Sequence, residues 1–307
     1  MADQPEQASH QLGRVTAKTV SWFNLRDEHS NTACLYCGRT ITTPSGLPFN
    51  KEHLIARNFV PGTMGEDAFQ FLFRACVPCN SRKADIERHV SSVTLLNGPG
   101  RLTDPKAARA ALNKAVHDFH PTRPGVAMGQ AHEAHTIDVP GAGSSMTLGF
   151  VAPVNALPDL VSELALRHVQ GLFSLLTTKN YLAQVSLLPP SQVWVLRGFT
   201  RSDWGHPWLA EVAGRVSDWE CRANVVSGSG YFKAMFRRHP TLGWFWALEW
   251  NKELRVVGAI SHDRPTLFDN LPDEGWFEVA GERLREEVPY DEAQDRLFEG
   301  TVVESFI

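Results

Sequence analysis

The chain of 307 residues is long enough for about two domains of the usual size. Hydrophobic residues make up 43% of it, and no apolar run approaches the length of a membrane-crossing helix, so we expect a globular protein with no membrane partner. The formal net charge is −4, but residues 263–307 hold 13 acidic and 4 basic side chains, so a mildly basic body precedes an acidic tail. The polar N-terminus lacks the apolar region of a signal peptide, which predicts a cytoplasmic location.

The predicted elements begin with a short helix at 14–28, inside an N-terminal extension at 1–30. The residues from Cys79 onward contain no Gly or Pro until position 98, which predicts a helix. A second helix is predicted from Asp104 to about Phe119, because Pro105 suits the first turn of a helix. Residues 121–157 are rich in Gly, Pro and Ser and are typical of a linker or an irregular, partly β segment.

The pattern changes at Pro158, where an amphipathic helix runs to about Lys179. Trp244, Trp246 and Trp250 share strand parity, so we expect them on one packed face of a sheet, with a platform for stacked nucleic-acid bases as the alternative. Strands are predicted at 191–197, 231–236, 244–250 and 254–260. A turn at 251–253 is predicted to join the last two.

The predicted fold class is α+β, with the chain divided after an N-terminal extension into three parts. Residues 31–95 form a compact unit around paired cysteines, 96–157 form a helix and linker, and 158–307 form a separate α+β domain with a mainly antiparallel sheet and an acidic tail. The last domain carries no motif that indicates a chemistry.

Four of the five cysteines form two CxxC pairs, Cys34 with Cys37 and Cys76 with Cys79. In a chain without an export signal, two such pairs indicate a metal site rather than disulfides. Four thiolates can enclose a tetrahedral Zn²⁺ with no open position, so the spacing predicts a structural zinc site. The alternative, two redox dithiols, needs a βαβ context that the sequence does not indicate.

The residues between and after these pairs resemble the zinc-stapled form of the HNH endonucleases. The family pattern is CxxC, then Asp-His or Glu-His before an apolar pair, then CxxC followed by Asn or His and by Lys three residues further on. This chain has the same order in Cys34, Cys37, Glu52, His53, Cys76, Cys79, Asn80 and Lys83. The resemblance implies a ββα-metal fold for residues 31–95 and metal-dependent hydrolysis of phosphodiester bonds in DNA.

By this resemblance His53 is the general base, and Glu52 and Asn80 bind a catalytic Mg²⁺ or Mn²⁺. An imidazole that titrates near neutrality can take the proton of a water molecule, and a hard divalent ion prefers carboxylate and amide oxygens. Arg57, Arg82 and Lys83 are expected to contact phosphates of the nucleic acid, with a solvated surface as the alternative for each. Lys83 lies one helical turn from Asn80 and could meet a carboxylate instead of a phosphate.

Three positions depart from the family pattern. Most members have Asp where this chain has Glu52, and Ala56 replaces the Pro that often follows the apolar pair. The middle Asn, which orients the base histidine, is Phe71 here, with Gln70 or Asn58 as candidates to substitute for it. The alternatives are therefore a zinc-stapled nucleic-acid-binding module with impaired catalysis, or an RNA-directed nuclease.

We expect the C-terminal domain to supply target choice, regulation through a partner, or self-association as a homo-oligomer. The combination of a nuclease unit with a second domain suggests a role in restriction or anti-phage defence.

Overall fold

In the computed structural model of the chain, the described residues are 31–41, 46–61, 72–120, 123, 125–130, 132–139, 144–151, 156–177, 187–272, 276–279, 282–285 and 289–300. The helix predicted at 14–28 lies outside these residues, as do Gln70 and Phe71. Within the described part of the chain, no helix is both long and apolar enough to cross a membrane.

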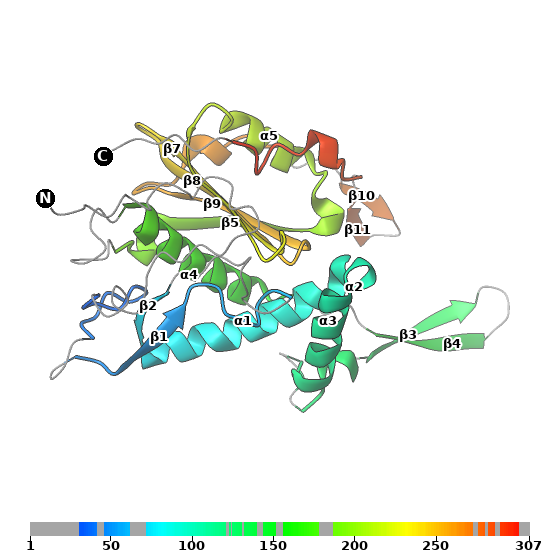
Figure 1. The fold of residues 1–307 in the computed structure, drawn as a ribbon. Helices are drawn as coiled ribbons and strands as arrows, with labels where there is room; N and C mark the ends of the chain where they lie inside the picture. Colours follow the sequence, from blue (N-terminus) through cyan, green and yellow to red (C-terminus); the bar gives the residue numbers. More distant parts are fainter. Residues whose placement is uncertain are drawn as a thin grey trace, which may run out of the picture.

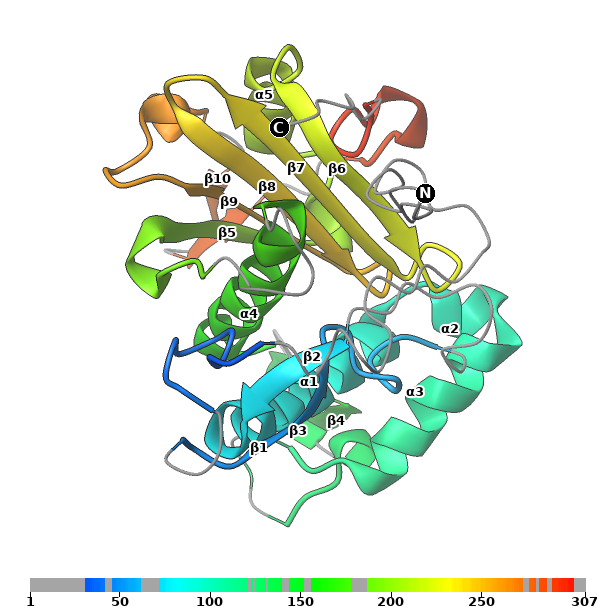
Figure 2. The same ribbon diagram turned by 60° about the vertical axis from the view of Figure 1, so that its left-hand side comes forward.

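The N-terminal part is built on an antiparallel hairpin that leads directly into a long helix. β1 (Phe49–His53) pairs along its whole length with β2 (Leu72–Cys76). α1 (Val77–Asn97) begins at the next residue, with Pro78 in its first turn, where a backbone N–H would have no helical partner. Figures 1 and 2 show the hairpin lying against the first half of α1, so the order of elements is strand, strand, helix.

A short helical connection and a second hairpin follow α1. α2 (Gly100–Thr103) precedes α3 (Pro105–His117), and the carboxylate of Asp104 caps α3 by accepting from the backbone N–H groups of its first turn. β3 (His132–Val139) and β4 (Ser144–Val151) form an antiparallel hairpin that projects from the body in Figure 1. The predicted linker at 121–157 therefore contains two regular strands.

The C-terminal part consists of a helix followed by an antiparallel sheet. α4 (Pro158–Thr177) agrees with the predicted amphipathic helix. The five strands of the sheet lie in the order β5 (Val193–Thr200), β9 (Leu254–Ile260), β8 (Gly243–Trp250), β7 (Phe232–His239) and β6 (Glu220–Ser227). All neighbouring strands are antiparallel.

The remaining elements connect or cover this sheet. α5 (Pro207–Arg215) lies between β5 and β6, and β10 (Trp276–Val279) pairs with β11 (Glu282–Arg285). The predicted turn between β8 and β9 is present, with Asn251 and Lys252 at positive φ. Short 3₁₀ helices occur at Met128–Gln130 (η3), Pro190–Gln192 (η4), Arg201–Asp203 (η5), Thr266–Phe268 (η6) and Glu292–Gln294 (η7).

The two faces of the five-stranded sheet pack against different partners. Trp246 and Trp250 are buried on the face that meets α4, and Trp244 packs against the same cluster. This confirms that the three tryptophans share one sheet face. Phe245 and Ala247 alternate with them and pack on the opposite face, in a cluster with α5. Figures 1 and 2 show α4 between the sheet and the hairpin–helix unit.

The described residues thus form a mixed helix and sheet structure with a mainly antiparallel five-stranded sheet, as expected for the fold class. The two parts share one hydrophobic cluster. Ile55 and Val90 from the N-terminal part, Leu172 from α4 and Trp250 from the sheet all belong to it. The core is therefore continuous across the domain boundary predicted at residue 158.

Candidate metal centre and adjoining groove

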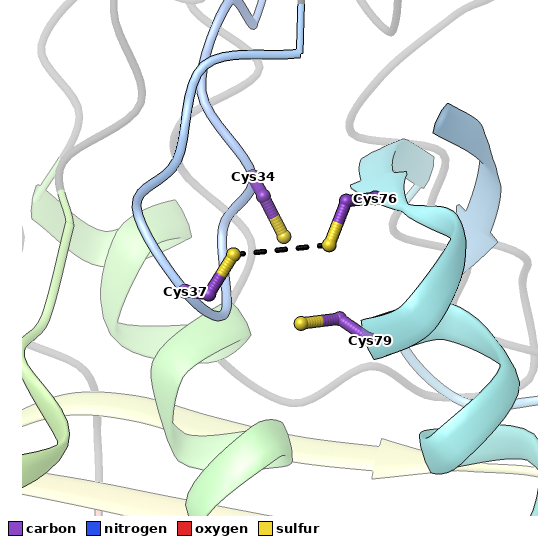
Figure 3. Close-up of side chains that lie close together, drawn as sticks. All are labelled: Cys34, Cys37, Cys76 and Cys79. Atoms are coloured by element: carbon purple, nitrogen blue, oxygen red, sulfur yellow. Dashed lines mark hydrogen bonds between the residues drawn. The ribbon is translucent and has the colours of Figure 1, made fainter. Parts of the chain in front are cut away.

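The four paired cysteines come together at the base of the first hairpin. Cys34 and Cys37 lie on a turn before β1, Cys76 ends β2, and Cys79 lies in the first turn of α1 (Figure 3). The side chain of Asn31 fixes the turn to β2, because it donates to one backbone group of Arg74 and accepts from another at 2.9 Å each.

The geometry of the cluster fits a tetrahedral metal. The four sulfur atoms all lie within 4.8 Å of one another, and those of Cys37 and Cys76 are 3.7 Å apart. Four Zn–S bonds of about 2.3 Å at tetrahedral angles place sulfur atoms about 3.8 Å apart. Burial opposes ionisation of the Cys37 thiol, but hydrogen bonds with Arg39 outweigh it and lower its pKa to about 6, which favours a thiolate ligand. The cluster can therefore hold a structural metal such as zinc.

Beside this cluster, the hairpin and α1 enclose a buried group of charges. The ammonium of Lys83 lies 2.8 Å from a carboxylate oxygen of Glu52 and 2.8 Å from one of Glu87. The hydroxyl of Tyr36 donates to the same oxygen of Glu52 at 3.0 Å. Lys83 also donates to the backbone carbonyl of His53 at 3.0 Å, so it joins the strand end to the helix.

This arrangement corrects the expectation of a phosphate contact for Lys83 and agrees with the alternative, contact with a carboxylate. Its side chain is only 1% exposed and is neutralised by two carboxylates, so it does not contact phosphates in this structure. Burial by itself lowers the pKa of Lys83, but the charges of Glu52 and Glu87 outweigh burial and raise it, so the ammonium stays protonated.

The buried charges also connect the hairpin–helix unit to α4. Glu87 accepts from the backbone N–H of Ala56 at 3.1 Å and lies 3.4 Å from the ring of His168 on α4. Burial lowers the pKa of His168, which favours its neutral form. Burial raises the pKa of Glu87, but the ammonium of Lys83 and the contact with His168 outweigh it, so Glu87 stays ionised. Glu87 on α1 therefore contacts both the loop after β1 and α4.

A groove of about 410 Å³ opens next to this network, at the end of β1. His53 is half-buried in it, and burial together with the positive charges of Arg57 and Lys51 lowers the pKa of this imidazole. The groove is lined by Lys51, Glu52, His53, Ala56, Arg57, Asn58, Phe59, Asn80, Ala84, Glu87, Arg88, Ser91, Lys114 and Asp118. It therefore brings one imidazole, whose lowered pKa favours its neutral form, together with four cationic side chains and three carboxylates.

The predicted metal ligands Glu52 and Asn80 both line this groove. Asn80 donates its amide N–H to the carbonyl of Lys51 at 3.4 Å, which leaves its carbonyl oxygen as an acceptor. Both contacts of the Glu52 carboxylate with the described residues are made by Oε1, the oxygen that faces Lys83. One carboxylate and one amide oxygen are donors of the kind that Mg²⁺ prefers. The Glu52 carboxylate is buried and paired with Lys83, and burial raises its pKa.

The remaining predicted residues divide between the groove and the surface. Arg57 lines the groove, as expected for a phosphate contact. Arg82 does not. It lies on the exposed side of α1, where it makes two contacts with one oxygen of Glu163, at 2.7 and 3.1 Å. Asn58, a candidate for the missing middle Asn, also lines the groove.

Five charged residues of the groove were not predicted from the sequence: Lys51, Glu87, Arg88, Lys114 and Asp118. Arg88 carried a usable signal, because it lies eight positions after Asn80 and such residues share one face of a helix. Lys114 and Asp118 come from α3, whose packing against α1 no local pattern reveals.

Comparisons of the chain with protein-family models, with curated proteins and with solved structures found no match in any of the three. The chemistry of the groove is therefore the basis for any functional assignment.

Proposed function

We propose that this protein is a metal-dependent endonuclease of the HNH type that hydrolyses phosphodiester bonds in DNA. The observation that carries the proposal is the groove. The imidazole of His53 from the hairpin and the amide of Asn80 from α1 meet there among cationic side chains, beside a four-cysteine metal centre. The ordered resemblance of these residues to the HNH pattern agrees with the same chemistry.

In the proposed reaction His53 removes a proton from the attacking water. A base must be unprotonated to do this, and the lowered pKa of His53 keeps its imidazole neutral at pH 7. The hydrogen bond from Lys83 to the backbone carbonyl of His53 fixes the strand end that carries the ring. Lys83 is thus a positioning residue in this proposal, and it acts without contact to the substrate.

Glu52 and Asn80 are the residues that would hold the divalent ion. When bound, such an ion stabilises the negative charge that develops on the phosphorane and on the leaving oxygen. Arg57 and Lys51, which line the same groove, orient the phosphate backbone in this proposal.

A second candidate is a nucleic-acid-binding module that has lost catalysis. Phe71 occupies the place of the family's middle Asn, and Glu52 is paired with Lys83. Either feature can lower activity while the cationic groove still binds phosphates. An RNA substrate is also compatible with these groups, because the phosphodiester is the same.

The proposal is tested by incubating the purified full-length protein with supercoiled plasmid in Mg²⁺, in Mn²⁺ and in excess EDTA. We expect metal-dependent conversion to the nicked form, and its loss in His53→Ala. A gel shift on the same samples separates the candidates. Binding without cleavage in any metal supports the module, and cleavage of an RNA transcript but not of the plasmid makes RNA the substrate.

A further inference from the structure

The groove continues along α1 beyond the proposed cleavage site. Asn80, Ala84, Arg88 and Ser91 recur at intervals of three or four, so they lie on one face of the helix, and all four line the groove. Asn80 and Arg88 are separated by a rise of about 12 Å along the helix axis. Two turns of α1 thus form one wall of the groove.

Lys114 on α3 reaches the far end of this groove. Its side chain is 14% exposed, and its ammonium lies 3.6 Å from an oxygen of Asp118, the residue that follows α3. The same oxygen of Asp118 accepts a hydrogen bond from the hydroxyl of Ser92. Arg88 is exposed, and its guanidinium forms no ion pair with any described residue.

The far end therefore carries two cations and one carboxylate. Burial lowers the pKa of Lys114, and the charge of Arg88 lowers it further against the attraction of Asp118. Two positive charges that repel each other inside a concave wall are stabilised by an anion placed between them.

We propose that Arg88 and Lys114 form a second phosphate site, which binds a phosphate of the same nucleic acid whose scissile phosphate lies at His53. This inference rests on the proposed nuclease function and adds where the substrate runs. One strand of a duplex carries a phosphate per about 3.4 Å of axis, so a span of about 12 Å corresponds to three or four phosphates. The substrate is accordingly a polynucleotide duplex that lies along α1, with α3 as part of the binding wall.

The test uses the full chain with His53→Ala, so that binding is measured without cleavage. Fluorescence anisotropy with a labelled DNA duplex of about 20 base pairs gives Kd across a series of salt concentrations. In this background Arg88→Gln and Lys114→Gln should each raise Kd about tenfold and lower the salt slope by about one phosphate contact. Arg82→Gln is the matched control, since Arg82 lies on the same helix and is paired with Glu163 outside the groove.

Each variant is first checked for thermal stability, because Lys114 is largely buried and its replacement can disturb the contact of α3 with α1. Arg88 is exposed, so Arg88→Gln keeps the test decisive if Lys114→Gln unfolds. A Kd and salt slope of Arg88→Gln equal to those of Arg82→Gln would overturn the second phosphate site.

The same experiment separates this inference from the proposed function. If the His53→Ala protein binds DNA and the wild type cleaves it, but Arg88→Gln changes neither Kd nor the salt slope, the nuclease function is supported and the second phosphate site is contradicted. If neither binding nor cleavage occurs, both the nuclease function and the second phosphate site are contradicted. Tighter binding of an RNA duplex of the same sequence, with the same loss in Arg88→Gln, would overturn DNA as the occupant.

Discussion

Two buried clusters of charge, one in each part of the molecule, have the same arrangement of a cation between two carboxylates but different surroundings. In the N-terminal part Lys83 lies between the carboxylates of Glu52 and Glu87, at 2.8 Å from each. In the C-terminal part Arg255 lies between Glu249 at 2.9 Å and Asp295 at 2.6 Å. Each cluster places a cation that is 1% exposed between two acids, and Glu249 also pairs with the partly exposed Lys233 at 3.0 Å.

The difference lies in what else each cation contacts. Lys83 donates to the carbonyl of His53, at the edge of the groove. Arg255 lies 3.7 Å from the centre of the Trp204 ring and 5.3 Å from that of Tyr290, and Asp295 belongs to the C-terminal segment 289–300. Buried ion clusters therefore do not mark a functional site by themselves. The contact with a residue that lines a concave, cationic surface distinguishes the first cluster from the second.

The largest expected effect comes from the metal centre, which the C-terminal part lacks among its described residues. Cys76→Ser should abolish bound zinc and unfold the hairpin–helix unit, because zinc binding contributes about 10 kcal/mol or more in small structural sites. Metal content measured by mass spectrometry and the thermal transition check this. Cys221→Ser, at a buried cysteine outside the cluster, is the control and should retain a full equivalent of zinc. Equal zinc in both variants would contradict the assignment.

The two ion clusters can be compared directly by removing each cation. Lys83→Met should cost about 3–5 kcal/mol of unfolding free energy, because it leaves two buried carboxylates without their cation. Arg255→Met should cost less, because Glu249 keeps its ion pair with Lys233 at 3.0 Å. Only Lys83→Met should also lower the nicking rate per folded molecule, since only Lys83 holds His53. Urea unfolding and plasmid nicking at low temperature give the two quantities. Equal nicking rates per folded molecule in the two variants would show that both clusters serve stability alone.

The pH dependence of nicking tests the state of the base in the groove. A general base works when it is unprotonated, and burial lowers the pKa of His53 below its ordinary value of about 6.5. The rate should therefore rise about tenfold for each pH unit in the acidic range and level off before pH 7. Single-turnover rates from pH 5 to pH 8 measure this. A rate that still rises steeply above pH 7 would be inconsistent with a lowered pKa.

The smallest expected effect concerns Glu253, at the turn between β8 and β9. Burial raises its pKa to about 7, against the attraction of Arg201. A carboxyl whose pKa is raised by folding stabilises the native state at low pH, and this contribution is lost as pH rises from about 4.5 to 7. Glu253→Gln should therefore gain stability relative to the wild type above pH 7, by about 1 kcal/mol after solvent screening. Urea unfolding at pH 5 and pH 8 tests the sign. A gain at pH 5 that disappears at pH 8 would contradict it.

Much of the fold could be predicted from the sequence where a single element carries its own pattern. The Gly-free and Pro-free run after Cys79 corresponds to α1, and the amphipathic run after Pro158 corresponds to α4. The strands at 244–250 and 254–260 agree with β8 and β9. α5 and β6 were not predicted, although α5 has buried side chains at helical spacing and β6 is as long as β7 and β8.

The cysteines and the histidine of the site could be identified in the sequence. The burial and the partners of its charged residues could not. The structure buries Glu52 and half-buries His53, and both residues line the same groove. The helical spacing of Asn80 and Lys83 does not indicate which of the two side chains faces the core. Lys83 is buried because two carboxylates neutralise its charge: Glu87, one helical turn further on, and the long-range partner Glu52, about thirty residues earlier in the chain. Such long-range partners have no local signature.

The most direct test of the proposed nuclease compares two histidine variants in the same cleavage assay. His53 lines the groove, whereas His117 lies exposed on α3 and does not line it, although Lys114 and Asp118 beside it do. With Mg²⁺ and equal zinc content, His53→Ala should lose activity by a factor of about 100 or more, while His117→Ala stays close to the wild type. Equal activity of the two variants, or cleavage that persists in EDTA, would contradict a metal-dependent site built on His53.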